Sequence, residues 1–344
     1  MNQPITYSDA GVSIDAANVA VERIKRMARS TFNAQTLSDI GSFGGMFDAT
    51  FPGLNAPVLV ASADGVGTKL KIAFMTNRHD TVGRDLVNHC VNDILVQGAR
   101  PLFFLDYVAT GALAPDVIAS VVEGVARGCR ENGCVLLGGE TAEMPGFYAA
   151  GEYDIAGFVV GVVERDKIID GQRVAPGDRL LALPSAGLHT NGYSLARKLC
   201  FEVAGYDADT HLDELGMSIG DALLQPHLSY LSSLAGLLDT GAIKALAHIT
   251  GGGLLDNLPR VLPEGTAVET KRDSWPVLPV FHVMQRLGQV LEAEMYRAFN
   301  MGVGMVIICA DADAAAIKSH LGSVNQACYD IGHVVTGART VELV

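Results

Sequence analysis

The sequence predicts an α+β / α/β fold in two domains, in which mixed sheets pack against helices. The chain has 344 residues, and domains usually hold roughly 100 to 200 residues. Predicted strands often follow one another directly, which favours α+β layering over one continuous parallel sheet. The hydrophobic fraction of 49% and the charged fraction of 18% suit a compact, enzyme-like chain. Because the pattern restarts near residue 164, we place an N-terminal domain at 1–168 and a C-terminal domain at 169–344.

In the N-terminal half, hydrophobic residues recur every three or four positions in the expected helices, and short apolar runs bounded by turns mark the strands. The expected elements are helices over 14–30, 81–97 and 115–130, and strands over 57–61, 102–108, 134–137 and 153–163. Basic residues toward the end of the first helix suit the helix dipole. Asp80 is a suitable N-cap for the second helix.

The C-terminal half shows the same mixture of elements. We expect strands over 179–183, 305–309 and 329–335, a helix over 195–203, a short helix ending at residue 260, and an alanine-rich helix after residue 309. Three successive glycines, Gly251–Gly253, open the short helix and can form an anion-binding nest of backbone N–H groups.

The charge balance excludes some partners. The formal net charge of −13 argues against a broad surface for nucleic acid or an anionic membrane. An anionic substrate therefore needs a local positive site made of lysines, backbone amides or Mg²⁺. The six cysteines are scattered through apolar segments without a C-x-x-C pair, which is typical of reduced core residues. With no apolar run long enough to cross a bilayer and no signal-like start, we expect a cytoplasmic protein.

Potential phosphate chemistry concentrates after the strand predicted at 57–61. Asp64 could coordinate Mg²⁺, Gly65 and Gly67 let backbone N–H groups approach a phosphate, and Thr68 and Lys69 follow directly. The spacing is not that of a P-loop, and no P-loop motif occurs in the chain. On these residues alone, a plain β-turn followed by a solvated helix is equally well supported.

A polar stripe runs along the helix predicted at 81–97. Its members recur at spacings of three and four: Asp85, Asn88, His89, Asn92 and Asp93. Such a stripe usually faces solvent. Asn92 and Asp93 have no lysine or arginine at i+3 or i+4, and the helix follows the Asp64 loop. A role for Asp93 as a metal ligand and a role as a solvated surface residue are therefore equally well supported.

Four further features are candidates for ligand contacts. Asp106 lies inside an apolar strand, where a carboxylate needs a partner or an ion. The pair Gly139–Glu140 follows another predicted strand. The glycine-rich loop 38–46 could close over a ligand or be an ordinary connection. His189 lies on a loop with polar neighbours, where it could contact a ribose or phosphate or simply be exposed.

Longer motifs resemble the phosphoribosylformylglycinamidine cyclo-ligase family, also called aminoimidazole ribonucleotide synthetases. The resemblance runs nearly end to end and is carried by the segments 7–12, 64–70, 90–93, 98–107, 138–146, 189–194, 248–253 and 294–297. It implies a homodimer in which the N-terminal mixed sheets join into a shared barrel, with ATP bound in a cleft. It also implies a C-terminal α/β domain whose sheet is covered by helices.

The resemblance also implies a reaction. ATP phosphorylates the formyl-derived amide oxygen of formylglycinamidine ribonucleotide, which turns a poor leaving group into phosphate. The substrate's own amidine nitrogen then attacks that carbon and closes the imidazole ring of 5-aminoimidazole ribonucleotide, a step of purine biosynthesis. The expected ligands are ATP, Mg²⁺ and this small-molecule ribonucleotide.

Carried over residue by residue, the resemblance assigns roles. Asp64 and Asp93 would hold Mg²⁺. The nucleotide contacts would be Lys25, Gly44, Gly45, Asp64, Gly65, Gly67, Thr68, Lys69, Asp106, Gly139 and Glu140. The ribonucleotide contacts would be His189, Asn191 and Ser194. Lys69, Asp93 and His189 would be the catalytic residues.

Other families share the Asp-Gly-x-Gly-Thr-Lys plan. Selenophosphate synthetase is disfavoured because no cysteine precedes Cys90, and the hydrogenase-maturation protein because the chain does not end in cysteine. The larger formylglycinamidine synthetase needs more domains. Thiamine-phosphate kinase remains the alternative, although it lacks the motifs at His189 and Glu294. A protein that binds ATP without turnover, as a regulator of a purine complex, is the alternative outside enzymes.

Overall fold

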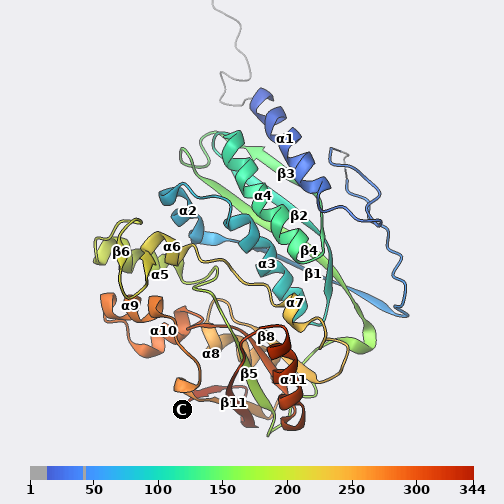
Figure 1. Cartoon of the computed structure of the whole chain (residues 1–344), viewed down its shortest axis with the longest axis vertical. Helices are drawn as coiled ribbons and strands as arrows, with labels where there is room; N and C mark the ends of the chain where they lie inside the picture. The colour runs from blue at the N-terminus through green and yellow to red at the C-terminus, as the bar shows by residue number, and fades with distance from the viewer. Residues whose placement is uncertain (1–13, 42–43) are drawn as a thin grey trace, which may run out of the picture.

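Two main sheets, one from each half of the sequence, organise the part of the chain that the computed structural model describes, residues 14–41 and 44–344 (Figure 1). The motif at 7–12 lies outside these residues. The connection from Arg165 to Asp178 joins the two sheets, and we propose the domain boundary at 168/169 within it.

The first sheet has four strands in the order β1-β4-β2-β3. Their bounds are β1 Pro57–Gly65, β2 Arg100–Thr110, β3 Val135–Glu143 and β4 Tyr153–Glu164. β4 pairs antiparallel with both β1 and β2, whereas β2 and β3 are parallel. Burial alternates along β4, because successive side chains point to opposite faces of a strand.

Helices cover one face of this sheet (Figure 1). They are α1 Ile14–Arg29, α3 Val82–Leu95 and α4 Pro115–Glu131, and a short helix α2 Leu70–Thr76 follows a 3₁₀ turn after β1. α3 packs on β1 and β4, and it crosses α4 where Gly83 faces Gly124. A Cβ atom at Gly83 would lie 2.1 Å from the Val121 carbonyl oxygen, so glycine permits this close approach.

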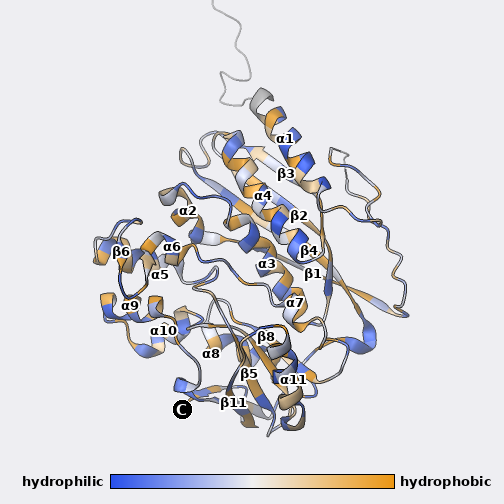
Figure 2. Ribbon diagram, viewed as in Figure 1, coloured by the Kyte–Doolittle hydropathy of each residue, from blue (hydrophilic) through white to orange (hydrophobic). Residues whose placement is uncertain are grey.

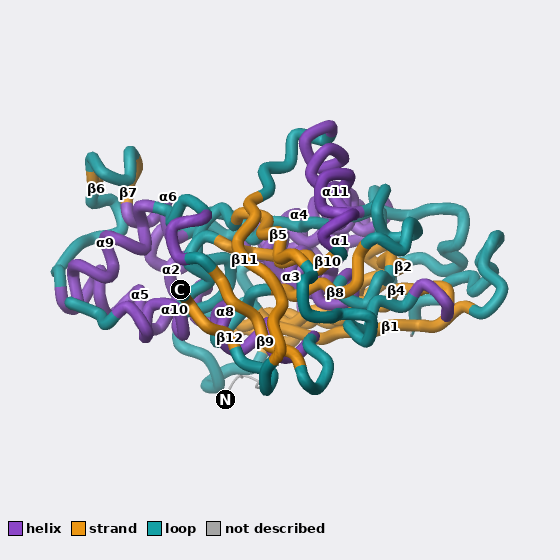
Figure 3. The backbone as a smooth tube through the Cα atoms, turned by 90° about the horizontal axis from the view of Figure 1, so that it is seen from below, coloured by secondary structure: helices purple, strands orange, loops and turns teal. Residues whose placement is uncertain are grey.

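The second sheet has six strands in the order β12-β9-β11-β5-β10-β8 (Figure 3). Their bounds are β5 Arg179–Pro184, β8 Ile243–His248, β9 Thr266–Thr270, β10 Val303–Cys309, β11 Tyr329–Thr336 and β12 Val341–Leu343. Neighbouring strands are antiparallel except β12 and β9. A two-stranded hairpin, β6 His211–Leu212 and β7 Met217–Ser218, lies apart from it.

Strands β5, β8 and β10 of the second sheet are buried on both faces. Leu181 and Ile307 belong to one apolar core together with Leu321 of α11, and Leu180 and Ile308 belong to another. The helices of this half are α5 Tyr193–Arg197, α6 Ile219–Leu223, α7 Leu231–Leu234, α8 Gly253–Asn257, α9 Pro279–Gly288, α10 Glu292–Ala298 and α11 Asp311–Ser323. These three strands are largely hydrophobic, as strands buried on both faces usually are, whereas polar residues are mixed into the other strands of the sheet (Figure 2). The predicted mixed two-domain fold is confirmed.

Two local predictions are wrong. β3 runs on to Glu143 because its ladder with β2 continues to Thr110, so Gly139 and Glu140 lie inside a strand and not at its end. Thr81, and not Asp80, is the N-cap of α3, without a side-chain hydrogen bond. The helix expected over 195–203 is present, and its second part, Lys198–Val203, is π-helical.

Most of the polar stripe of α3 is buried and not solvated, with Asp93 as the part-exposed member. Asp85, Asn88 and Asn92 hydrogen-bond the backbone of residues 227–230, which belong to the other half of the chain. Asn88 Nδ2 donates to the His227 carbonyl at 2.7 Å, and the His227 N–H donates to Asp85 at 2.7 Å. Asn92 binds the Leu228 carbonyl at 2.8 Å and the Tyr230 N–H at 3.1 Å. α3 is therefore the main polar contact between the two halves.

Within residues 14–41 and 44–344, each helix is too short or too polar to cross a membrane.

Candidate active site between the two halves

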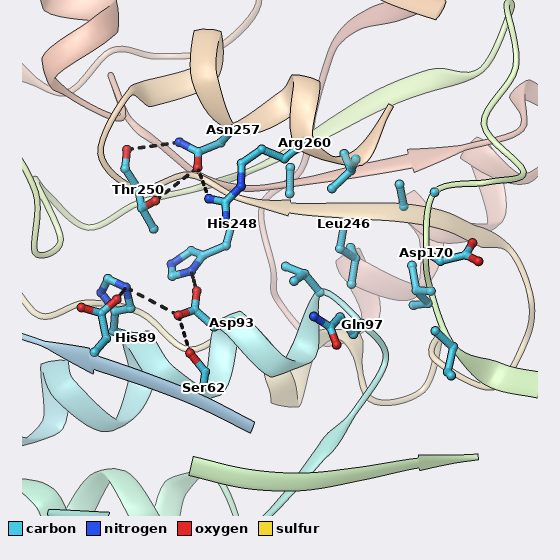
Figure 4. Close-up of a pocket in the computed structure, with 18 of the residues that line it drawn as sticks. Ser62, His89, Asp93, Gln97, Asp170, Leu246, His248, Thr250, Asn257 and Arg260 are labelled. Carbon is cyan, nitrogen blue, oxygen red and sulfur yellow. Dashed lines mark hydrogen bonds and ion pairs between the residues drawn. The ribbon is translucent and has the colours of Figure 1, made fainter. Parts of the chain in front are cut away.

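Two cavities adjoin the loop after β1. The larger, about 610 Å³, lies between β1 and α3 on one side and β8 with residues 250–261 on the other (Figure 4). The smaller, about 270 Å³, is lined by Asp64, Gly65, Val66, Gly67, His89, Thr190, Asn191 and Thr250. Asp64, His89 and Thr250 line both. Two ligands, one in each cavity, would thus meet beside Asp64.

Asp64 and Asp93, the two predicted metal ligands, both line the larger cavity. His89 Nε2 lies 2.6 Å from an Asp64 oxygen, and His248 Nδ1 lies 2.9 Å from Asp93 Oδ1. The second Asp93 oxygen accepts a hydrogen bond from the Ser62 hydroxyl at 3.0 Å. Figure 4 shows Asp93 between the two imidazoles. Each carboxylate is thus oriented by a nearly buried histidine.

A hydrogen-bonded chain connects these two histidines through the C-terminal half. His89 Nδ1 lies 2.7 Å from the Thr190 hydroxyl, which lies 3.3 Å from His227 Nδ1. His227 Nε2 lies 3.0 Å from His248 Nε2. The chain passes from α3 through two loops to the end of β8, so the geometry of both carboxylates depends on contacts between the two halves.

These contacts keep the carboxylates ionised. Burial alone would raise the pKa of Asp64, but the hydrogen bond and charge of His89 outweigh it and hold that pKa below its ordinary value. Burial is likewise outweighed at Asp93, where His248 lowers the pKa. Burial is the largest influence on His89 and lowers its pKa, but the hydrogen bond to Asp64 and the charges of Asp64, Asp93 and Asp85 together outweigh it, so the net shift is upward. Asp64 and Asp93 therefore favour the ionised form, and His89 beside Asp64 favours the protonated form.

Within the described residues, His89, Asp93 and His248 each offer a ligand atom, and these atoms lie within 4.8 Å of one another. Carboxylate oxygens are the protein ligands that Mg²⁺ prefers, and imidazole nitrogens suit other divalent metals. This cluster of one carboxylate and two imidazoles fits a divalent cation beside Asp93. Asp64 is not part of the cluster and contacts it through His89, at 2.6 Å.

Lys69, predicted as a phosphate contact, lies in the interior of the fold. Its side chain is fully buried, with Nζ 2.7 Å from Asp85 and donating to the Gln225 carbonyl at 2.7 Å. It lines neither cavity. The 3₁₀ turn over Gly67–Lys69 directs the side chain inward beneath α3, where it neutralises the buried Asp85. The phosphate and catalytic roles of Lys69 stay predictions.

His189, predicted as a substrate contact and a catalytic residue, is also enclosed by the protein, and both roles stay predictions. Its ring is fully buried and stacks on His227 with 4.1 Å between centroids. Its Nε2 accepts from the N–H groups of Ala186 and Leu228 at 3.4 and 3.5 Å. It supports the neighbouring Thr190 and Asn191, which line the smaller cavity.

The other predicted contacts divide into two groups. Gly65 and Gly67 line the smaller cavity. Thr68 and Ser194 are exposed and lie 3.3 Å apart across the two halves, outside both cavities. The remaining predicted nucleotide contacts also lie outside both cavities: Lys25, Gly44, Gly45, Asp106, Gly139 and Glu140.

Asp106 lies beneath the covering helices, and burial raises its pKa to about 7. A Cβ atom at Gly139 would lie 2.1 Å from an Asp106 oxygen, so this glycine makes room for the carboxyl group. Lys25 pairs with Glu22 at 2.9 Å. The nucleotide roles of these residues stay predictions.

The structure adds residues that sequence reasoning missed. His89 and His248 were visible only as neighbours of predicted ligands, in the polar stripe and in the motif at 248–253. Thr190 appeared only as a member of the motif at 189–194, and its contact with His89 joins segments far apart in the sequence. His227 and Arg260 stood outside every motif singled out in the sequence.

Solved structures share this fold. Thiamine-monophosphate kinase from Stenotrophomonas maltophilia K279a superposes with a TM-score of 0.68 at 20% identity, covering 94% of this chain and 95% of that one. The hydrogenase maturation protein HypE of E. coli gives a TM-score of 0.66 at 19% identity, covering 94% and 92%. At such identities the likeness shows the fold alone.

Family models and sequence relatives identify the family to which the chain belongs. The N-terminal domain of AIR synthase related proteins matches residues 53–163, and the C-terminal domain matches residues 175–344. The chain is thus an AIR synthase related protein in both halves. It is similar to the phosphoribosylformylglycinamidine cyclo-ligases of Citrifermentans bemidjiense (52% identity, covering 99% of both chains) and Geobacter sulfurreducens (53%, covering 98% of both). The chain belongs to the phosphoribosylformylglycinamidine cyclo-ligase family.

Proposed function

We propose that this protein uses ATP to close the imidazole ring of 5-aminoimidazole ribonucleotide from formylglycinamidine ribonucleotide, releasing ADP and phosphate. The observation that carries the proposal is a sequence identity of about 50% to relatives named cyclo-ligases, over nearly the whole length of both chains. The cavities between the two halves support it, because both ligands of such a reaction could meet beside Asp64.

The chemistry has two stages. The γ-phosphoryl group of ATP moves to the amide oxygen of the substrate, and ADP leaves. The amidine nitrogen then attacks the activated carbon, loses a proton, and phosphate departs with the former amide oxygen. Little covalent help is needed, so the protein's main task is to hold the two reactants in register. Residues from both halves line the junction where this would occur: Asp64, His89 and Thr250.

We propose that Asp64 and Asp93 hold Mg²⁺ together with ATP phosphates. The two carboxylates are ionised, face one cavity and supply the oxygen donors that Mg²⁺ takes. When bound, Mg²⁺ neutralises charge on the phosphates. His89 and His248 orient the carboxylates, and the backbone at Gly65 and Gly67 leaves room for phosphate oxygens at the smaller cavity.

We also propose a homodimer with a shared barrel. The face of the first sheet opposite its helices carries apolar side chains, including Leu59 at 63% exposure and Phe158 at 44%. These two lie on adjacent strands, β1 and β4, where Leu59 is opposite Val162 and Phe158 is opposite Ala63. Exposed apolar residues gathered on one face of a sheet are typical of interfaces. A second copy of the same sheet would cover it. The free cysteines, five of them buried, suit a reducing cytoplasm.

The test is an assay of purified protein with formylglycinamidine ribonucleotide, ATP and Mg²⁺, following aminoimidazole ribonucleotide and ADP. We expect equal amounts of both products. ADP formed with thiamine monophosphate instead would favour the kinase alternative, and ATP binding without turnover would favour a regulatory role.

A further inference from the structure

The larger cavity is rich in carboxylates and has one guanidinium group, while its histidines His89 and His248 are paired with Asp64 and Asp93. Its described lining includes three carboxylates, Asp64, Asp93 and Asp170, and Arg260 is its sole lysine or arginine. Lys69 is paired with the buried Asp85 and does not line this cavity, so it cannot balance the charge of an anion bound in it. An anion entering an acidic cavity requires a compensating charge. Arg260 can supply this charge to a second phosphate group, separate from the ATP phosphates that would be held with Mg²⁺.

The surroundings of Arg260 leave its charge free for a ligand. It follows α8 in a 3₁₀ turn, Leu258–Val261, and Nη1 donates to the Asn257 side chain at 3.2 Å. Within residues 14–41 and 44–344, no carboxylate forms an ion pair with it. A guanidinium held by a neutral amide keeps most of its N–H groups for bidentate contact with phosphate.

Asn257 itself is firmly placed. Its Nδ2 donates to the carbonyl groups of Gly251 and Gly253 at 3.1 and 2.8 Å, and its oxygen also accepts from the Thr250 hydroxyl at 3.2 Å. The glycine loop that the sequence suggested as an anion nest thus serves to anchor the amide that positions Arg260. Figure 4 shows the guanidinium on the same side of the cavity as Asn257 and His248.

We infer that Arg260 binds the phosphate group of the ribonucleotide substrate, and this inference rests on the proposed function. The polyphosphate of ATP has its own counter-charge in Mg²⁺ with Asp64 and Asp93, and backbone amides at Gly65 and Gly67. The ribonucleotide brings a separate dianionic phosphate, which neither carboxylate can accommodate. The 610 Å³ cavity offers it room, with Arg260 as its partner.

The experiment compares Arg260→Ala with wild type on two substrates, the ribonucleotide and its 5′-dephosphorylated nucleoside. Loss of a charged hydrogen bond predicts a fall in kcat/KM of about 10- to 100-fold for the ribonucleotide. The variant should treat the nucleotide and the nucleoside nearly alike, whereas wild type prefers the nucleotide by a similar factor. KM for ATP should stay within about twofold of wild type, and Arg260→Lys should restore part of the activity.

Arg286→Ala is the matched control, because Arg286 is an exposed arginine paired with Glu214 outside both cavities. It should leave all these constants unchanged. Calorimetric binding of the ribonucleotide separates two failures. If wild type neither binds nor cyclises it, the proposed function falls. If wild type does both and Arg260→Ala binds it equally well, or raises KM for ATP instead, the assignment of Arg260 is overturned.

Discussion

At the scale of single residues, a substitution at Asp93 tests the proposed metal site. Asp93→Asn keeps the size of the side chain and removes its charge, so we expect kcat to fall at least about tenfold through lost charge stabilisation in the transition state. Steady-state kinetics at saturating ATP and Mg²⁺ measure this. Ser62→Ala, which removes the hydroxyl that binds Asp93 but leaves the carboxylate, should retain most of the activity. Normal turnover of Asp93→Asn would remove Asp93 from the metal role.

Lys69 should matter for stability. Lys69→Met leaves Asp85 buried without its counter-charge, which costs about 3 to 5 kcal/mol in comparable buried pairs. Denaturant unfolding checks the loss. In the double variant Lys69→Met with Asp85→Asn, the amide oxygen can still accept the His227 N–H, so part of the stability should return. If Lys69→Met has the stability of wild type and only its KM for ATP rises, the result would instead support Lys69 as a phosphate contact.

The sequence could predict Asp64 and Asp93 as a pair, because one ends a strand and the other lies on a helix that packs against it. It could not place Lys69, whose enclosure depends on Asp85 and on Gln225 of the other half. Residue type alone does not distinguish a lysine that faces a phosphate from one that faces a buried carboxylate.

At the scale of elements, the crossing of α3 and α4 depends on glycine. Gly83→Ala would push a methyl group against the Val121 carbonyl of α4, and overpacking of this kind costs about 1 to 3 kcal/mol. The measurement is the free energy of unfolding. Gly322→Ala on α11 is the control, since a Cβ atom there meets nothing within 4 Å and the helix should gain up to about 1 kcal/mol. Equal effects of the two substitutions would refute the close crossing.

Most elements were predictable because their periodicity is local. α1, α4, β2 and β4 end within about two residues of the expected positions. What periodicity could not show is which environment a polar face meets. The stripe on α3 has the spacing of a solvated face, yet it binds the peptide groups of residues 227–230. The chain of histidines was equally hidden, because its members lie on elements far apart in the sequence.

At the scale of the whole molecule, the uncovered face of the first sheet predicts the oligomeric state. Phe158→Lys places a charge in the proposed barrel, and we expect the dimer to dissociate into monomers in sedimentation velocity experiments. Val324→Lys is the control, because Val324 is exposed to the same 44% but lies on the other half of the chain. A wild-type protein that sediments as a monomer would contradict the dimer.

The burial of α3's polar stripe has a consequence for folding. A fragment that ends near residue 168 would expose the side chains of Asp85, Asn88 and Asn92 without the peptide groups they bind, and the complementary fragment would bare those peptide groups. Neither fragment alone can satisfy the hydrogen bonds of the polar groups at this contact. The protein should therefore melt in one cooperative transition, with the catalytic cleft assembled in the same event that makes the chain stable.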